Sequence, residues 1–195
     1  MPRFGRGVGG CYNNIDILIY TVLLILINFI NPTLINLFEL IMETQYTWKT
    51  KLFSNRFEIY SYDKIAGEIK KEGWSRRVSG ELNARKIVFE TRGFFNYKTQ
   101  IINTENNAEI GQINYQKWRA KSTIICDDKK YYWQFNNFFR TKWTLSNENG
   151  ILVKYHSRGF KGFIISYSKD EILILTGFFI RNFMNQRSAE IAAVS

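Results

Sequence analysis

The chain has 195 residues, and its 45% apolar and 16% aromatic content is enough for a large core, which excludes general disorder. Its 27 Lys and Arg against 17 Asp and Glu give a formal net charge of +10, and the surplus lies after residue 43. Such a surplus favours anionic partners, namely phospholipid, nucleic acid or acidic protein, or serves solubility alone. The only cysteines, Cys11 and Cys126, exclude a disulfide framework and fit a reducing compartment.

The first 42 residues differ in texture from the rest. Residues 1–14 are glycine-rich and predict a flexible tail, and residues 15–42 are overwhelmingly apolar. The run over 17–42 exceeds the roughly 20 residues that a bilayer needs, which predicts an apolar helix acting as a single-pass membrane anchor, kinked at Pro32. A second interpretation stays open. If the mature chain starts at Met42, these residues are an upstream extension and the protein is cytoplasmic.

From Tyr46 onward the sequence is a series of short β-type segments separated by turn residues. Gly67 inside one of them predicts a bulge or a close backbone approach. Asn149-Gly150 is a strong hairpin signal. The predicted strands are Tyr46–Phe53, Arg56–Tyr62, Ile65–Lys71, Gly73–Gly80, Leu82–Thr91, Phe94–Asn103, Ala108–Gln116, Trp118–Cys126, Tyr131–Phe135, Phe138–Leu145, Ile151–His156 and Lys161–Tyr167.

A helix is predicted over residues 168–185, followed by a C-terminal tail at 188–195. Ser168 and Glu171 have the spacing of a capping box, and the residues from Ile172 to Met184 leave no polar face around the helix. The apolar run is too short for a bilayer, so we expect protein to enclose it. The sequence therefore predicts a mainly β domain over 43–187, a closed antiparallel barrel of about twelve strands with this helix inside and Arg181 reaching water at the far mouth.

This order of elements resembles the tubby C-terminal superfamily, which includes tubby-like proteins, phospholipid scramblases and plant LURP-one-related proteins. The resemblance covers about Tyr46 to Gln186 and implies a twelve-stranded barrel around a hydrophobic C-terminal helix. Tubby proteins bind phosphoinositides through Lys and Arg, but none of those positions can be matched here. Scramblases carry an acidic calcium-binding segment before the helix. This chain has only Asp170 and Glu171 there, which argues against calcium dependence.

The side chains that catalysis needs are sparse. His156 is the only histidine, and alternation places it on the outward face with Lys154, opposite Tyr155. Asp127-Asp128 lies in a turn signal, which is a better interpretation than a metal-binding pair. We therefore expect no enzymatic activity, no catalytic residues, no cofactor and no metal site.

Three basic pairs are the candidate lipid-binding residues, provided that they gather at one rim of the barrel. The alternative is a solvated surface. Lysine and arginine beside tryptophan, as in Lys117-Trp118-Arg119 and Lys142-Trp143, would also suit single-stranded nucleic acid, but such aromatics more often fill a barrel interior. The pairs are Lys70 and Lys71, Arg76 and Arg77, and Lys129 and Lys130.

The leading functional hypothesis is a non-enzymatic, membrane-associated barrel that binds anionic phospholipid. The alternative is a soluble scaffold for an acidic protein partner. A scramblase-like lipid transfer comes third, because one enclosed helix offers no path for headgroups. Nucleic acid is not expected as a partner.

Overall fold

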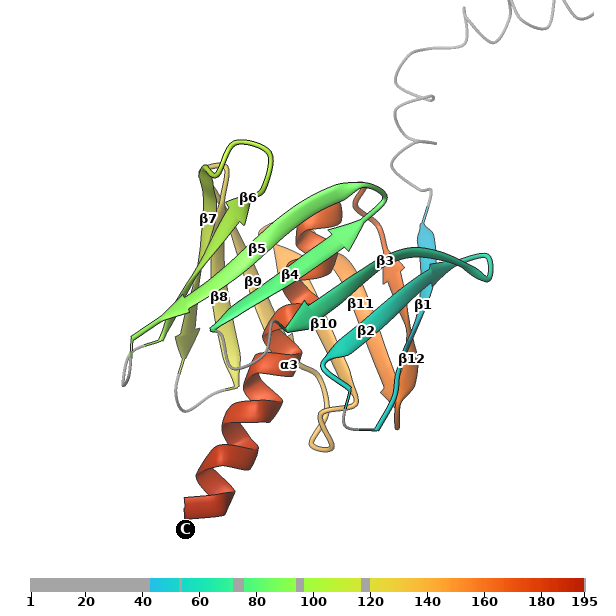
Figure 1. The fold of residues 1–195 in the computed structure, drawn as a ribbon, viewed down its shortest axis with the longest axis vertical. Coiled ribbons are helices and arrows are strands. Elements are labelled where there is room, and N and C mark those ends of the chain that lie inside the picture. Colours follow the sequence, from blue (N-terminus) through green and yellow to red (C-terminus); the bar gives the residue numbers. More distant parts are fainter. Residues whose placement is uncertain (1–42, 53, 72–75, 94–96, 117–119, 195) are drawn as a thin grey trace, which may run out of the picture. The chain divides into compact units, whose positions relative to one another are not determined.

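Twelve antiparallel strands that follow one another in the chain form the wall of a closed barrel (Figure 1). The computed structural model describes residues 43–194 except 53, 72–75, 94–96 and 117–119. The barrel closes because the first strand pairs with the last, Thr44 lying opposite Ser166. The strands are β1 (Thr44–Thr50), β2 (Arg56–Ser61), β3 (Lys64–Lys71), β4 (Arg77–Leu82), β5 (Arg85–Arg92), β6 (Lys98–Asn103), β7 (Glu109–Gln116), β8 (Lys121–Cys126), β9 (Lys129–Phe135), β10 (Lys142–Asn147), β11 (Gly150–Arg158) and β12 (Lys161–Ser166).

Side chains alternate between the interior and the surface along each strand, as the two-residue repeat of a strand requires. On β11, Val153 and Tyr155 are buried and Lys154 is exposed. His156 lies on the outward face, half-buried and stacked on Phe163 with 4.8 Å between ring centroids. The prediction of an outward-facing histidine is therefore confirmed.

The turn signals in the sequence mark real hairpins. Asp127 and Asp128 form the two-residue loop between β8 and β9 with φ of 47° and 59°, the left-handed conformation that favours Asp, Asn and Gly. At the hairpin between β10 and β11, the Asn147 side-chain oxygen accepts hydrogen bonds from the backbone N–H groups of Asn149 and Gly150. Both predicted turns are confirmed.

Gly67 is needed for a close approach between neighbouring strands. The pairing of β2 with β3 shifts register beside it, between Ile59 and Tyr60, and a Cβ on Gly67 would lie 2.7 Å from the Cα of Leu82 on β4. The residue thus combines the bulge and the close backbone approach that the sequence predicts.

The helix α3 (Glu171–Val194) runs through the ring of strands and projects beyond it (Figure 1). All side chains from Ile172 to Ile180 are buried. Phe178 packs against Trp48 of β1 and Trp143 of β10, and Phe179 stacks on Phe89 of β5 with 4.1 Å between centroids. Strands from different sides of the barrel therefore touch the helix, which confirms that the wall encloses it.

The two ends of α3 differ from the sequence prediction. The side chain of Asp170 caps the helix by accepting the Ile172 N–H at 2.9 Å, while Ser168 accepts the N–H of Asp170 at 3.1 Å. The predicted capping box of Ser168 and Glu171 is therefore wrong, because the chain turns two residues later. The helix also continues to Val194, through residues predicted to be a tail, because Arg187 pairs with Glu190 and Ser188 bonds to Arg140.

Several predicted strands begin too early, since β4, β5, β6, β8 and β10 start at Arg77, Arg85, Lys98, Lys121 and Lys142. The structure describes the loop before β10 completely. There the Asn137 side-chain oxygen accepts the N–H groups of Thr141 and Lys142, which turns the chain before the strand begins. Phe138 and Phe139 consequently lie in a loop and not on a strand.

The predicted tail at 1–14 and the predicted apolar helix or membrane anchor at 17–42 lie outside the described residues. Within the part of the chain that the structure describes, no helix has both the length and the hydropathy to cross a bilayer.

Candidate functional site

The barrel has two mouths, which we name by the helix. The start mouth carries the loops after the even-numbered strands, that is, before β3, β5, β7, β9 and β11, together with the residues leading from β12 into α3. The exit mouth carries the loops after β1, β3, β5, β7, β9 and β11, and α3 leaves the barrel there. This assignment follows from the antiparallel order, because every second strand begins at the same end.

The start mouth is the end of the barrel where odd-numbered strands begin and even-numbered strands finish. Carboxylates concentrate at this end. They come from the hairpin loops and from the first and last residues of strands. They are Glu43, Asp63, Glu81, Glu105, Glu109, Asp127, Asp128, Glu148, Asp170 and Glu171.

The exit mouth is basic instead. Several of its cations pair with carboxylates, as Arg56 does with Glu68 at 2.5 Å and Arg92 with Glu90 at 3.0 Å. The remaining cations make no ion pair with a described residue, so their field reaches solvent. They include Lys51, Lys71, Arg76, Lys98, Lys121, Arg140, Lys142, Arg158 and Lys161.

The structure brings together only part of the predicted lipid site. Lys70 and Lys71 end β3 at the exit mouth. Arg77 begins β4 beside them and Arg76 directly precedes it, since Lys71 pairs with Val78 across the ladder. Lys129 and Lys130 begin β9, next to the Asp127-Asp128 turn at the start mouth. The first two pairs share one rim, and the third lies at the opposite end.

Large apolar side chains protrude from the exit mouth. Phe138 is 93% exposed and Phe139 is 81% exposed, and their rings meet edge to face at 5.7 Å. Phe160 and Leu52 are exposed on the loops after β11 and β1. Because β9, β10, β11, β12, β1 and β2 are consecutive in the wall, these loops form one continuous arc. We call Leu52, Phe138, Phe139 and Phe160 the apolar arc.

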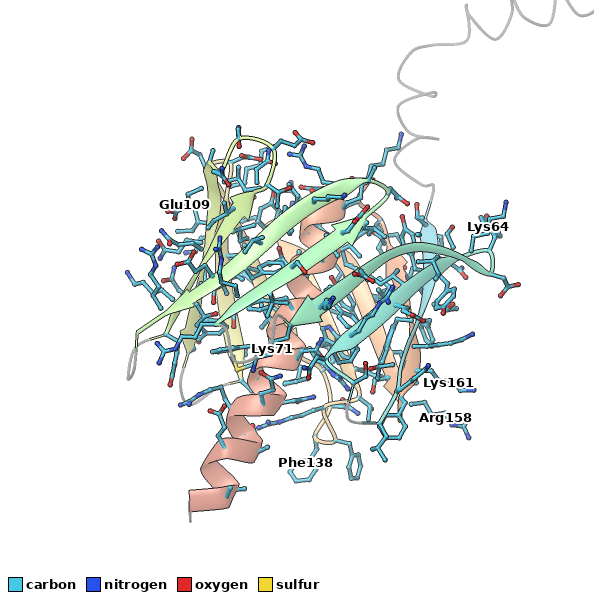
Figure 2. All side chains as sticks on the ribbon, viewed as in Figure 1. Lys64, Lys71, Glu109, Phe138, Arg158 and Lys161 are labelled. Carbon is cyan, nitrogen blue, oxygen red and sulfur yellow. The ribbon has the colours of Figure 1, made fainter. Side chains whose placement is uncertain are left out.

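The loop that carries the two phenylalanines is held in place. Its Arg140 guanidinium donates to the Ser188 hydroxyl of α3 at 2.7 Å and lies 5.5 Å from the Phe135 ring. Figure 2 shows Phe138 pointing away from the barrel, at the same end as Arg158 and Lys161, whereas Glu109 and Lys64 lie at the other end. Sequence reasoning missed this arc because Phe138 and Phe139 were assigned to a strand.

A cleft of about 610 Å³ lies beside the arc, between α3 and the exit ends of the strands from β2 to β5. Its apolar lining comes from Phe57, Ile69, Val78, Phe179 and Phe183. The volume lies within the range of roughly 300–1,000 Å³ typical of small-molecule sites.

Four cations line the same cleft, namely Lys71, Arg76, Arg181 and Arg187. The single carboxylate in the lining, Glu190, is already paired with Arg187 at 2.8 Å. The cleft therefore combines an apolar lining with an excess of positive charge.

The sequence predicts that the Arg181 charge reaches water, whereas the structure holds the side chain between aromatic rings. It is half-buried between the rings of Trp48 and Trp143, at 5.5 Å and 5.3 Å from their centroids, and it donates to Ser157 and Asn182 side chains. Burial lowers the pKa of the Arg181 guanidinium to about 10. No described carboxylate forms an ion pair with it, so its charge is balanced only by aromatic faces and dipoles.

Two buried donors at this place lack an acceptor. They are Nε of Arg181 and Nδ2 of Asn182, and both residues line the cleft. Buried polar atoms are nearly always hydrogen-bonded, so each of these exceptions needs an explanation.

Groups suited to catalysis stay apart among the described residues. Burial raises the pKa of the Cys126 thiol to about 12, which disfavours its nucleophilic thiolate form. Within the described ranges, no group of three or more His, Cys, Asp or Glu side chains could hold a metal ion.

No protein-family model, curated protein or solved structure matches the chain. The structure therefore defines the class as a closed twelve-stranded β-barrel with a C-terminal core helix. The resemblance to the tubby C-terminal superfamily stays a prediction.

Proposed function

We propose that the protein is a non-enzymatic, membrane-associated barrel that binds anionic phospholipid with its exit mouth. The observation that carries the proposal is the coincidence of unpaired cations and exposed phenylalanines at one end of the molecule. A cation near an anionic membrane surface contributes about 1 kcal/mol, and phenylalanine side chains gain free energy on leaving water for the interfacial region. The acidic start mouth would face away from the lipid.

The apolar arc favours lipid over an acidic protein. An acidic partner would satisfy the cations but offers no reason for Phe138 and Phe139 to stand almost fully in solvent on a braced loop. Lipid transfer through the barrel has less support, because Trp48, Trp133 and Trp143 fill the interior around α3.

Hydrogen–deuterium exchange of the full chain with vesicles tests the proposal. With phosphatidylserine in the vesicles, backbone amides of residues 136–141 and 159–160 should gain protection, and with phosphatidylcholine alone they should gain little. High salt should reverse the protection, because it screens charge. Every variant retains residues 17–42, so comparing variants isolates the barrel surface from any effect of that segment.

Two double charge reversals form a matched pair. Arg158→Glu with Lys161→Glu should weaken docking by roughly 30-fold or more, since two cations at about 1 kcal/mol each are lost. Lys129→Glu with Lys130→Glu makes the same charge change at the start mouth and should leave docking within about twofold of the unmodified chain. Phe138→Ser with Phe139→Ser should abolish loop protection. Equal protection by both vesicle types, or equal loss in both reversals, would refute the proposal.

A further inference from the structure

The cleft beside α3 has features that docking on a membrane does not use. Docking needs outward-facing groups, whereas Phe179 and Phe183 line an internal wall together with Ile69 and Val78. Phe183 packs against Tyr115 with 4.5 Å between ring centroids, and Phe179 stacks on Phe89. The lining is therefore held in place by the core. A preformed apolar wall beside open space is the usual form of a small-molecule site.

The charge around this wall specifies the chemistry of an occupant. Of the four cations that line the cleft, Lys71 makes no ion pair with a described residue. Among the described residues, the Arg76 side chain donates only to the backbone oxygen of Gly93, at 3.1 Å. Arg181 has no described carboxylate partner either. An anionic group would therefore gain charge-assisted hydrogen bonds without displacing a carboxylate from these three residues.

The unpartnered donors point to the same conclusion independently. Nε of Arg181 and Nδ2 of Asn182 are buried without an acceptor, and a buried donor left without a partner destabilises the protein. A half-buried guanidinium held between Trp48 and Trp143 is a further cost that an anion nearby would relieve.

We propose that this cleft binds a single-chain amphiphilic anion, with the chain against the apolar lining and the anionic head beside Lys71, Arg76 and Arg181. Free fatty acids and lysophospholipids share this chemistry. A two-chain phospholipid would require more apolar space than one wall of a cleft of about 610 Å³ offers. The inference goes beyond membrane docking, because it assigns a bound ligand to a different set of side chains.

Calorimetric titration of the full chain with oleate, below its micelle concentration, tests the inference. Oleate should bind with one site per chain, and neutral monoolein should bind at least about tenfold more weakly because it lacks the charge. Oleoyl lysophosphatidic acid separates the two sources. Tighter binding than oleate assigns the site to a phosphate-bearing lipid, and weaker binding assigns it to a free fatty acid.

Variants on one helix give the decisive comparison. Asn185→Trp places a large ring in the cleft and should lower oleate affinity at least about tenfold. Ala189→Trp adds the same ring at an exposed position that does not line the cleft, and it should leave affinity unchanged. Lys71→Glu with Arg76→Glu should also weaken oleate binding at least about tenfold, whereas the reversal of Lys129 and Lys130 should not.

Absence of oleate binding, monoolein binding as tight as oleate, or equal binding by the Asn185 and Ala189 variants would overturn the inference. The Phe138→Ser, Phe139→Ser variant keeps the two proposals separate. It should lose membrane docking but keep oleate binding, because neither phenylalanine lines the cleft.

Discussion

Cys126 shows how strongly one buried side chain is controlled by its surroundings. The residue ends β8 with its side chain in the core and only 3% of its surface exposed. Burial is the largest cause of its raised pKa, and the nearby charges of Asp127 and Asp170 add to it. At a pKa of about 12, the thiolate at pH 8 is only about one part in ten thousand.

We therefore expect iodoacetamide at pH 8 to leave Cys126 unmodified in the folded protein and to modify it fully in urea. Peptide mass spectrometry of the fragment that contains Cys126 measures both states. The unfolded protein is the control for intrinsic reactivity. Alkylation at equal rates in the two states would show that the thiol is accessible.

The same pKa sets a pH dependence of stability. The unfolded thiol loses its proton near pH 9 and the folded thiol near pH 12, so the folded state binds more protons between these values. The contribution is complete below pH 9 and is lost as the pH rises towards 12. Burial also raises the pKa of Tyr155, which acts in the same direction. Urea unfolding at pH 8, 9 and 10 should show falling stability, with a smaller slope in Cys126→Ala.

At the scale of elements, α3 and β11 are fitted to each other at Gly177. The Tyr155 hydroxyl donates to the carbonyl oxygens of Leu173 and Ile174, at 3.3 Å and 3.0 Å, and the Trp133 indole N–H donates to the Gly177 carbonyl at 2.9 Å. A Cβ on Gly177 would lie 2.7 Å from the ring carbon Cζ of Tyr155 and closer still to its hydroxyl. The glycine allows the helix to pass the tyrosine.

Gly177→Ala should therefore destabilise the protein by about 2 kcal/mol or more, although alanine favours a helix over glycine by about 1 kcal/mol. Denaturant unfolding measures the change. Tyr155→Phe in the same chain should recover part of the loss, since the hydroxyl that meets the new methyl group is gone. A stabilising Gly177→Ala would show that the helix can shift within the barrel.

Elements were predictable where one local signal decided them. Alternation of inward and outward residues located the centres of the strands, and Asn147–Gly150 marked its hairpin. Strand starts such as that of β10 were not predictable. The loop there depends on Asn137 bonding to residues four and five positions ahead, and the exposed Phe138 and Phe139 imitate a strand.

On the scale of the whole molecule, the enclosed helix could be predicted because Ile172–Ile180 leaves no polar face. The candidate site could be predicted only in part. Lys71 and Arg76 share a rim because β3 and β4 pair. Lys129 lies at the other end, because β9 runs in the same direction as β3 and Lys129 begins its strand whereas Lys71 ends its own. The cleft depends on α3 extending beyond the wall, which the expected helix end at 185 did not include.

The barrel depends on its helix for a filled interior. A chain ending after Tyr167 would leave Trp48, Phe89 and Trp143 without Phe178 and Phe179, which they now contact. Empty space of this size cannot be offset by local relaxation, because removing even one buried Phe side chain costs about 3–5 kcal/mol. We expect this chain to be insoluble or to unfold without cooperativity in a thermal melt followed by near-ultraviolet circular dichroism.

A chain ending after Gln186 is the matched control. It keeps every buried residue of α3 from Ile172 to Ile180 and loses only the part that projects from the exit mouth. This shorter chain should still unfold cooperatively, with a modest loss because the bond from Arg140 to Ser188 is removed. A cooperative, soluble protein ending at Tyr167 would show that the wall holds its shape without the helix, and the barrel interior would then have to be filled in another way.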